Sequence, residues 1–165
     1  MIQYNIMPGL KLKGSIILPG DKSIAHRAVI LSAISSGKTV INNFPANEDC
    51  RSSLEVFRSL GIKIKKDTNG RLVILGKGLN GLTKPKRNLF IKESGTTFRL
   101  IIGLLASQSF GVKLIAGKAL SQRPMLRVIA PLRMMGASVS GRPLKLKNGK
   151  KEEYPPLTIN GSKLR

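Results

Sequence analysis

Cysteine, histidine and tryptophan are nearly absent from this 165-residue chain, which has one cysteine, one histidine and no tryptophan. The lone Cys50 excludes an internal disulfide framework and fits a reducing, cytoplasmic compartment. So few potential ligands also leave little to hold a transition metal, and we expect no metal site. Aromatic residues make up only 4% of the chain, which argues against a base-stacking platform for nucleic acid.

Long apolar runs are missing as well. The longest, Ala28–Ile34 and Leu100–Ala106, fall far short of the roughly 20 residues that a membrane span needs. Residues 1–10 contain no basic stretch followed by an apolar one, so we expect no signal peptide. With 41% hydrophobic residues and a length typical of one domain, the chain should fold around a core.

Negative charge is scarce, with 8 acidic residues against 29 lysines and arginines and a net charge of +21. Such an imbalance indicates acidic partners, which include nucleic acid, a membrane surface and small polyanions. The cations are spread through short clusters at 63–66, 84–87 and 145–151. A lysine-rich, solvated surface therefore explains them most simply, and a second explanation is that the chain is one piece of a larger protein.

Hydrophobic periodicity predicts one succession of strands and helices that occurs twice. The first copy comprises a strand over 10–18, a helix over 23–36 ended by Gly37, a strand over 39–44, a helix over 47–60 ended by Gly61, and a hairpin of 62–66 and 71–75. The second comprises a strand over 89–91, a helix over 95–107, a strand over 112–116, a helix over 125–135, and strands over 137–140 and 157–159 joined by a basic loop. In the last helix, Pro131 predicts a kink or a later start. The fold class is therefore α/β (α+β), built from repeated β-α-β-α-β-β units.

The first candidate site lies where the first helix begins. A turn at Gly20 precedes a helix that either Asp21 or Ser23 can cap. Ser23 and Arg27 share one face, with Lys22 beside them, at the helix end whose free N–H groups already favour an anion. Two cations and a hydroxyl there predict a clamp for phosphate or carboxylate. The alternative is an ordinary capped helix with a solvated lysine and arginine.

Two further segments repeat this arrangement in the second copy. Gly95 opens the helix of that copy and lets a ligand approach the backbone, while Thr96 and Arg99 share one face. Arg123, just before the last helix, offers a two-pronged donor for phosphate. Cationic helix entries that recur with the repeat predict a cleft for small polyanionic molecules.

Three other features are interpreted as structural. A G-x-G-x-x-G pattern at 76–81 is not followed by a helix, and the P-loop-like Gly37–Thr39 ends a helix instead of starting one. His26 is interpreted as a satisfied structural histidine, because no Ser/His/Asp set surrounds it.

Four segments together carry a family resemblance. Pro19–Arg27, Ser94–Arg99, Gln122–Met125 and Pro131–Ala137 occur in this order and resemble the EPSP synthases, or 3-phosphoshikimate 1-carboxyvinyltransferases. The sister family, UDP-N-acetylglucosamine 1-carboxyvinyltransferase, has asparagine in place of Ser23 and lacks the His-Arg pair, so it is the weaker match and stays an alternative.

The resemblance implies a chemistry and a fold. Its members transfer the enolpyruvyl group of phosphoenolpyruvate to the 5-hydroxyl of shikimate 3-phosphate and release phosphate, in the cytoplasm, without metal or organic cofactor. Each has two similar domains of three β-α-β-α-β-β units, with the site between the domains. We expect a full-length protein of this kind to be a monomer that binds neither membrane nor nucleic acid.

The resemblance also implies residue roles. Lys22 is the expected catalytic residue, in contact with both substrates, while Ser23 and Arg27 bind shikimate 3-phosphate. Gly95 and Arg123 line the phosphoenolpyruvate site, and Arg99 supports that loop.

Two departures from the family qualify this expectation. Glu93 stands where the family usually has Asn or Asp, and it should either weaken phosphoenolpyruvate binding or pair with Lys92 or Lys22. Family members are also well over twice as long. Residues 1–19 are then an N-terminal strand region of the other domain, and residues 20–165 form nearly two units of one domain, with little or no activity alone. A basic nucleic-acid-binding module and a non-catalytic fragment remain alternatives.

Overall fold

The computed structural model describes residues 3–5, 7–9, 11, 13–146 and 148–164. The helices are α1 (Lys22–Ile34), α2 (Glu48–Ser59), α3 (Gly95–Ala106), α4 (Leu126–Met134) and the short 3-10 helix η1 (Leu120–Gln122). The strands are β1 (Ser36–Ile41), β2 (Lys63–Lys66), β3 (Leu72–Lys77), β4 (Leu89–Ile91), β5 (Val112–Ala116), β6 (Ser138–Lys145) and β7 (Lys151–Asn160). No helix in the described part of the chain is both long and apolar enough to cross a membrane.

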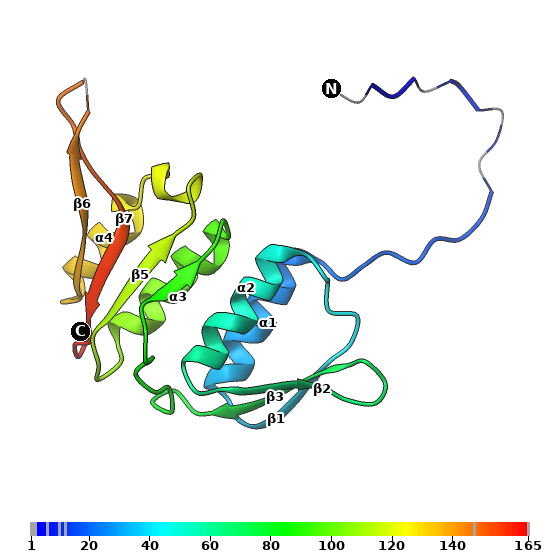
Figure 1. Ribbon diagram of the computed structural model, residues 1–165, viewed down its shortest axis with the longest axis horizontal. Coiled ribbons are helices and arrows are strands. Elements are labelled where there is room, and N and C mark those ends of the chain that lie inside the picture. The colour runs from blue at the N-terminus through cyan, green and yellow to red at the C-terminus, as the bar shows by residue number, and fades with distance from the viewer. Residues whose placement is uncertain (1–2, 6, 10, 12, 147, 165) are drawn as a thin grey trace.

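The strands form two sheets that share one topology. The first has the order β1-β3-β2 and is antiparallel, with the hairpin turn at 67–70 between β2 and β3. The second has the order β4-β5-β7-β6, in which β5, β7 and β6 correspond to β1, β3 and β2. Its additional strand, β4, pairs parallel to β5. The two sheets, each with its pair of helices, lie side by side in Figure 1 and confirm the predicted repeat of a mixed α/β unit.

The described residues of the segment predicted as a strand over 10–18 form no strand. Residues 11 and 13–18 are exposed, and the described chain before α1 runs away from the folded body (Figure 1). Residues 10 and 12 lie outside the described residues. A strand needs a neighbour for its backbone N–H and C=O groups. Here Asn43 Nδ2 donates to the Leu18 carbonyl at 3.2 Å, and no strand lies alongside.

Gly37 was wrongly predicted to end the first helix. That helix ends at Ile34, with Ser35 as its C-cap, and the chain passes at once into β1. Gly37 lies inside β1 with a φ of 97° and is paired with Gly76 of β3. A Cβ at Gly76 would collide with the carbonyl oxygens of Ser32 and Ser35, so β3 packs directly on the helix end. In contrast, Asn47 and Gly61 bound α2 as predicted.

In the last third of the chain the predicted strand bounds need correction, whereas the prediction for Pro131, a kink or a later start, is decided only for the start. Strands β6 and β7 are longer than the segments predicted at 137–140 and 157–159, and most of the expected basic loop is strand. The exposed lysines there mask the alternation that marks a half-buried strand, and a register shift between Ser140 and Arg142 interrupts it further. Pro131 does not delay α4, which begins at Leu126 and contains the proline.

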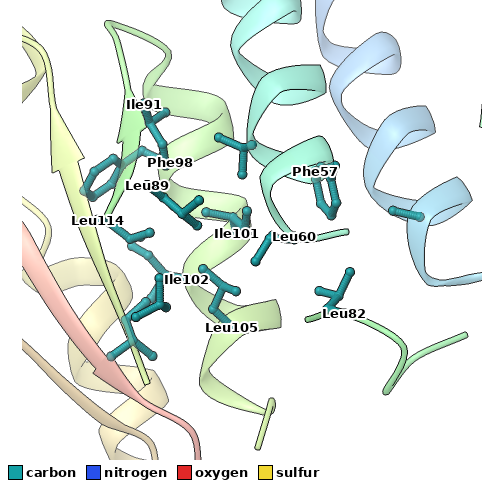
Figure 2. Close-up of a cluster of buried hydrophobic side chains, with 14 of the residues drawn as sticks. Phe57, Leu60, Leu82, Leu89, Ile91, Phe98, Ile101, Ile102, Leu105 and Leu114 are labelled. Carbon is teal, nitrogen blue, oxygen red and sulfur yellow. The ribbon is translucent and has the colours of Figure 1, made fainter. Parts of the chain in front are cut away.

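A single hydrophobic core joins the two units. Phe57 of α2 and Leu60, the C-cap of that helix, lie in one cluster with Ile101 and Leu105 of α3 (Figure 2), and all four side chains are fully buried. Leu82, from the connection between the units, lies against the same cluster. Because α2 belongs to the first unit and α3 to the second, this contact fixes how the units sit relative to each other.

Truncation at this contact should destabilise the whole chain. We expect Leu60→Ala to lower the free energy of unfolding by about 2–5 kcal/mol, because the α2–α3 contact loses apolar area and gains a cavity. Leu79→Ala, at a site where 58% of the side chain is exposed, is the matched control and should change it by less than about 0.5 kcal/mol. Urea titration followed by circular dichroism measures both. Equal effects of the two substitutions would contradict a shared core.

Candidate functional site

The N-terminal ends of three helices gather at one end of the molecule. Ion pairs between helix starts show this directly: Lys22 Nζ lies 2.8 Å from Asp49 in the first turn of α2, and Lys92 Nζ lies 2.9 Å from Glu48. Lys92 precedes α3 by three residues. Each helix is capped by a side-chain oxygen, from Asp21, Asn47 and Ser94 in turn. Asp21, not Ser23, is therefore the cap of α1.

The first candidate cluster is exposed at the start of α1. The side chain of Lys22 is half-exposed, and the hydrogen bond it donates to Asp49 raises its pKa above the usual value. Arg27 Nη1 donates to the carbonyl oxygen of Ser23 at 3.0 Å, which holds the guanidinium beside the Ser23 backbone. Lys22, Ser23 and Arg27 thus lie together, as the spacing predicts.

The second cluster forms around Gly95, the buried first residue of α3. A Cβ at Gly95 would lie 3.0 Å from Nη1 of Arg99 and 3.1 Å from Nη1 of Arg123, so two guanidinium groups meet over this glycine. Burial lowers the pKa of Arg99, and the positive charges of Arg127 and Arg123 lower it further. Arg99 Nε is buried without a hydrogen-bond partner in the described part of the chain.

These arginines are not neutralised by acids. Within the described residues, no carboxylate forms an ion pair with Arg27, Arg99, Arg123 or Arg127. Several unneutralised guanidinium groups at helix starts form a strong site for an anion that can accept bidentate hydrogen bonds. The arrangement suits phosphate or carboxylate chemistry.

The two clusters face the same end of the molecule. The charge of Arg123 opposes the rise in the Lys22 pKa, so the two cations act on each other. No hydrogen bond among the described residues joins Lys22, Ser23 or Arg27 directly to Gly95 or Arg123. The structure therefore brings all five predicted residues to one end of the molecule, as two neighbouring clusters.

A buried polar network lies behind these clusters. His26 Nδ1 lies 2.7 Å from Ser53 Oγ, which lies 2.7 Å from Thr97 Oγ1. Thr97 Oγ1 in turn lies 2.7 Å from the cap Ser94 Oγ, so the network links α1, α2 and α3. His26 is fully buried, as a structural histidine should be, but it is not fully satisfied, because Nε2 has no partner in the described chain.

Sequence reasoning missed several of these residues. Asp49, in the first turn of α2, was not among the predicted site residues, although it forms an ion pair with Lys22. Thr96 was expected on the functional face, but it is the next residue, Thr97, that enters the buried network. Arg127 drew no attention, because its approach to Arg99 depends on how α4 packs. Across the described residues, no three His, Cys, Asp or Glu side chains lie close enough together to hold a metal ion.

Glu93 does not pair with either expected lysine. Its carboxylate accepts hydrogen bonds from the backbone N–H groups of Ala119 at 3.3 Å and Leu120 at 2.7 Å. Lys22 and Lys92 are instead bound to Asp49 and Glu48.

Comparison with known proteins agrees with this arrangement. The family model described as EPSP synthase (3-phosphoshikimate 1-carboxyvinyltransferase) matches residues 6–165. The chain belongs to the EPSP synthase family. A 3-phosphoshikimate 1-carboxyvinyltransferase of Streptococcus pyogenes serotype M49 is 44% identical over 152 residues, which cover 92% of this chain and 34% of the relative.

A solved structure extends the likeness to the fold. The EPSP synthase of Acinetobacter baumannii superimposes with a TM-score of 0.79 at 37% identity, over 90% of this chain and 32% of that protein. This EPSP synthase family chain therefore spans about a third of the length of the relatives it matches.

The buried His26 should make stability depend on pH. Burial lowers its pKa below the usual value of about 6.5, so between these two pKa values the unfolded chain binds more protons than the folded one. The free energy of unfolding should therefore fall as the pH drops from 7.5 to 5.5.

This decrease in the free energy of unfolding can be assigned to His26, because it is the only histidine in the chain. We expect His26→Gln to flatten the dependence, as judged by urea titrations at pH 7.5, 6.5 and 5.5. An unchanged slope in the variant would contradict a neutral, buried imidazole.

Proposed function

We propose that this chain supplies the substrate-gripping first third of an enzyme that transfers the enolpyruvyl group of phosphoenolpyruvate to the 5-hydroxyl of shikimate 3-phosphate, with release of phosphate. The convergence of Arg99 and Arg123 on Gly95, without a carboxylate partner in the described chain, is the observation that carries this proposal. The names of its relatives support it, since they are 3-phosphoshikimate 1-carboxyvinyltransferases.

Each predicted site residue has a role in this reaction. Ser23 and Arg27 bind shikimate 3-phosphate, Gly95 and Arg123 line the phosphoenolpyruvate site, and Lys22 contacts both substrates. Two anions repel each other, so cations held in place before binding lower the free energy needed to bring them together. The same cations stabilise charge that develops on the leaving phosphate.

Lys22 acts as a fixed cation in this scheme. Its hydrogen bond with Asp49 raises its pKa, so the ammonium group stays protonated near neutral pH. A protonated lysine stabilises negative charge but does not accept a proton. The groups that exchange protons with the substrates are therefore expected in the other two thirds of the relatives' length.

The proposal includes a domain assignment. Residues 1–19 belong to the other domain of the full-length enzyme, and residues 20–165 form nearly two of its three units. Exposed apolar side chains support this: Ile24 and Leu31, on one side of α1, are 69% and 62% exposed. The first sheet also has three strands where the second has four. A cytoplasmic location and a monomeric full-length enzyme stay predictions.

A chimera tests the catalytic role of Lys22. Residues 6–165 replace the matching segment of the Streptococcus pyogenes relative, and phosphate release from the two substrates is measured. We expect Lys22→Ala to lower kcat about 100-fold or more, because a preorganised cation is lost from the transition state. Lys38→Ala, which removes the same charge from the exposed strand β1, should leave the rate within about twofold. Undiminished turnover of Lys22→Ala would remove Lys22 from the mechanism.

Binding to the unmodified chain tests the same site without the chimera. Shikimate 3-phosphate should shift the amide resonances of residues 21–27 in a ¹H–¹⁵N titration, because they surround its phosphate. Arg27→Ala should weaken this binding about tenfold through the lost charge-assisted hydrogen bonds, whereas Arg71→Ala, in the 67–71 hairpin turn, should not. Shifts confined to other segments would overturn the assignment.

A further inference from the structure

Glu93 occupies an unusual place in this site. It is an acid two residues before Gly95, the glycine that Arg99 and Arg123 approach, and Arg127 lies near enough to act on Arg99. An acid beside an anion site normally weakens binding by repulsion. Some favourable interaction of Glu93 must therefore offset its repulsion of a bound anion.

The hydrogen bonds of Glu93 supply that interaction. One carboxylate oxygen accepts from the N–H of Leu120 at 2.7 Å, and the other accepts from the N–H of Ala119 at 3.3 Å. These two residues begin the turn of η1, which ends at its C-cap Arg123. The carboxylate of Glu93 therefore binds the same short turn that presents the Arg123 guanidinium.

Backbone hydrogen bonds also hold the 117–121 turn close to Glu93. The N–H of Gly117 donates to the carbonyl oxygen of Lys92 at 2.6 Å, and the N–H of Ser121 donates to the carbonyl oxygen of Gly117 at 2.8 Å. A Cβ at Gly117 would collide with the Glu93 carboxylate, so only glycine allows this approach. Backbone and side chain thus tie segment 117–121 to residues 92–93.

We infer that Glu93 is a positioning residue for the anion site, which holds Arg123 over Gly95 by accepting the N–H groups of Ala119 and Leu120. This inference rests on the proposed function for the identity of the anion. The N–H groups draw the carboxylate toward the turn, where charge-assisted hydrogen bonds offset the cost of placing an acid near the site. Fixing the arginine before binding lowers the entropy lost when the anion arrives.

Two neutral variants separate positioning from charge. Glu93→Gln and Glu93→Ala both remove the negative charge, but glutamine keeps one carbonyl oxygen as an acceptor and alanine keeps none. If charge alone matters, both variants bind phosphoenolpyruvate equally, and more tightly than the unmodified chain. If positioning dominates, binding weakens by about tenfold in Glu93→Ala and by less in Glu93→Gln.

The experiment is a titration of the 165-residue chain with phosphoenolpyruvate, followed by ¹H–¹⁵N spectra. Glu55→Gln is the matched control, since it removes one negative charge from an exposed carboxylate on α2. The only ion pair of Glu55 among the described residues is a long one, 3.9 Å between its carboxylate and Lys92 Nζ. We expect the affinity of Glu55→Gln to stay within about twofold of the unmodified chain. Equal and tighter binding of both Glu93 variants would overturn the inference.

A measurement without ligand keeps the inference testable if the proposed function fails. Backbone ¹⁵N relaxation of residues 117–123 in the free chain should show increased motion in Glu93→Ala and an intermediate effect in Glu93→Gln. Unchanged relaxation in both variants would refute positioning by Glu93. Absence of phosphoenolpyruvate binding by the unmodified chain would count against the proposed function, and relaxation alone would then decide the role of Glu93.

Discussion

Repulsion among like charges is the constraint on which this site depends. Burial lowers the pKa of Arg99, and the positive charges of Arg127 and Arg123 nearby lower it further. Among the described residues, no carboxylate forms an ion pair with these three arginines. Such a group of cations separates unless packing holds it together. Arg99 is held because the other side of α3, with Phe98 and Ile101, is fully buried in the core. Hydrophobic burial therefore stabilises an arrangement that electrostatics opposes, and a bound anion relieves the repulsion.

The few acids of the chain have specific partners. Asp49 and Glu48 neutralise Lys22 and Lys92, and so join the starts of three helices. The carboxylate of Glu153 accepts hydrogen bonds from both Nη groups of Arg133, and these bonds lower its pKa. Glu93 binds backbone N–H groups rather than a cation. The acids thus bind lysines, one arginine and backbone turns, while among the described residues no carboxylate forms an ion pair with the arginines around Gly95.

The repeated unit explains how one end of the molecule collects these groups. Each unit places the start of its first helix at the same end, so α1 contributes Lys22 and α3 contributes Gly95. The core contact between α2 and α3 then sets the spacing between the two starts. The hydroxyls of Ser53 and Thr97 link these helices behind the site, so a shift of one helix disturbs both clusters. The packing that folds the chain thus also sets the geometry of both clusters.

Local patterns were sufficient for most elements and for the motif residues. The apolar periodicity of α2 and the Gly61 that follows it lie within a few residues of one another, so local patterns located this helix, and the structure adds Asn47 as its cap. The end of α1 and the lengths of β6 and β7 were not predicted correctly, because pairing with neighbouring strands decides them. Partnerships between distant residues, such as Lys22 with Asp49 or Glu93 with Leu120, are 27 positions apart in each case and arise only when the units pack. Sequence alone thus located the start of each α-helix to within one residue, because helix starts depend on local patterns. The tertiary fold decided which charges meet, since pairing energies depend on distances that only packing sets.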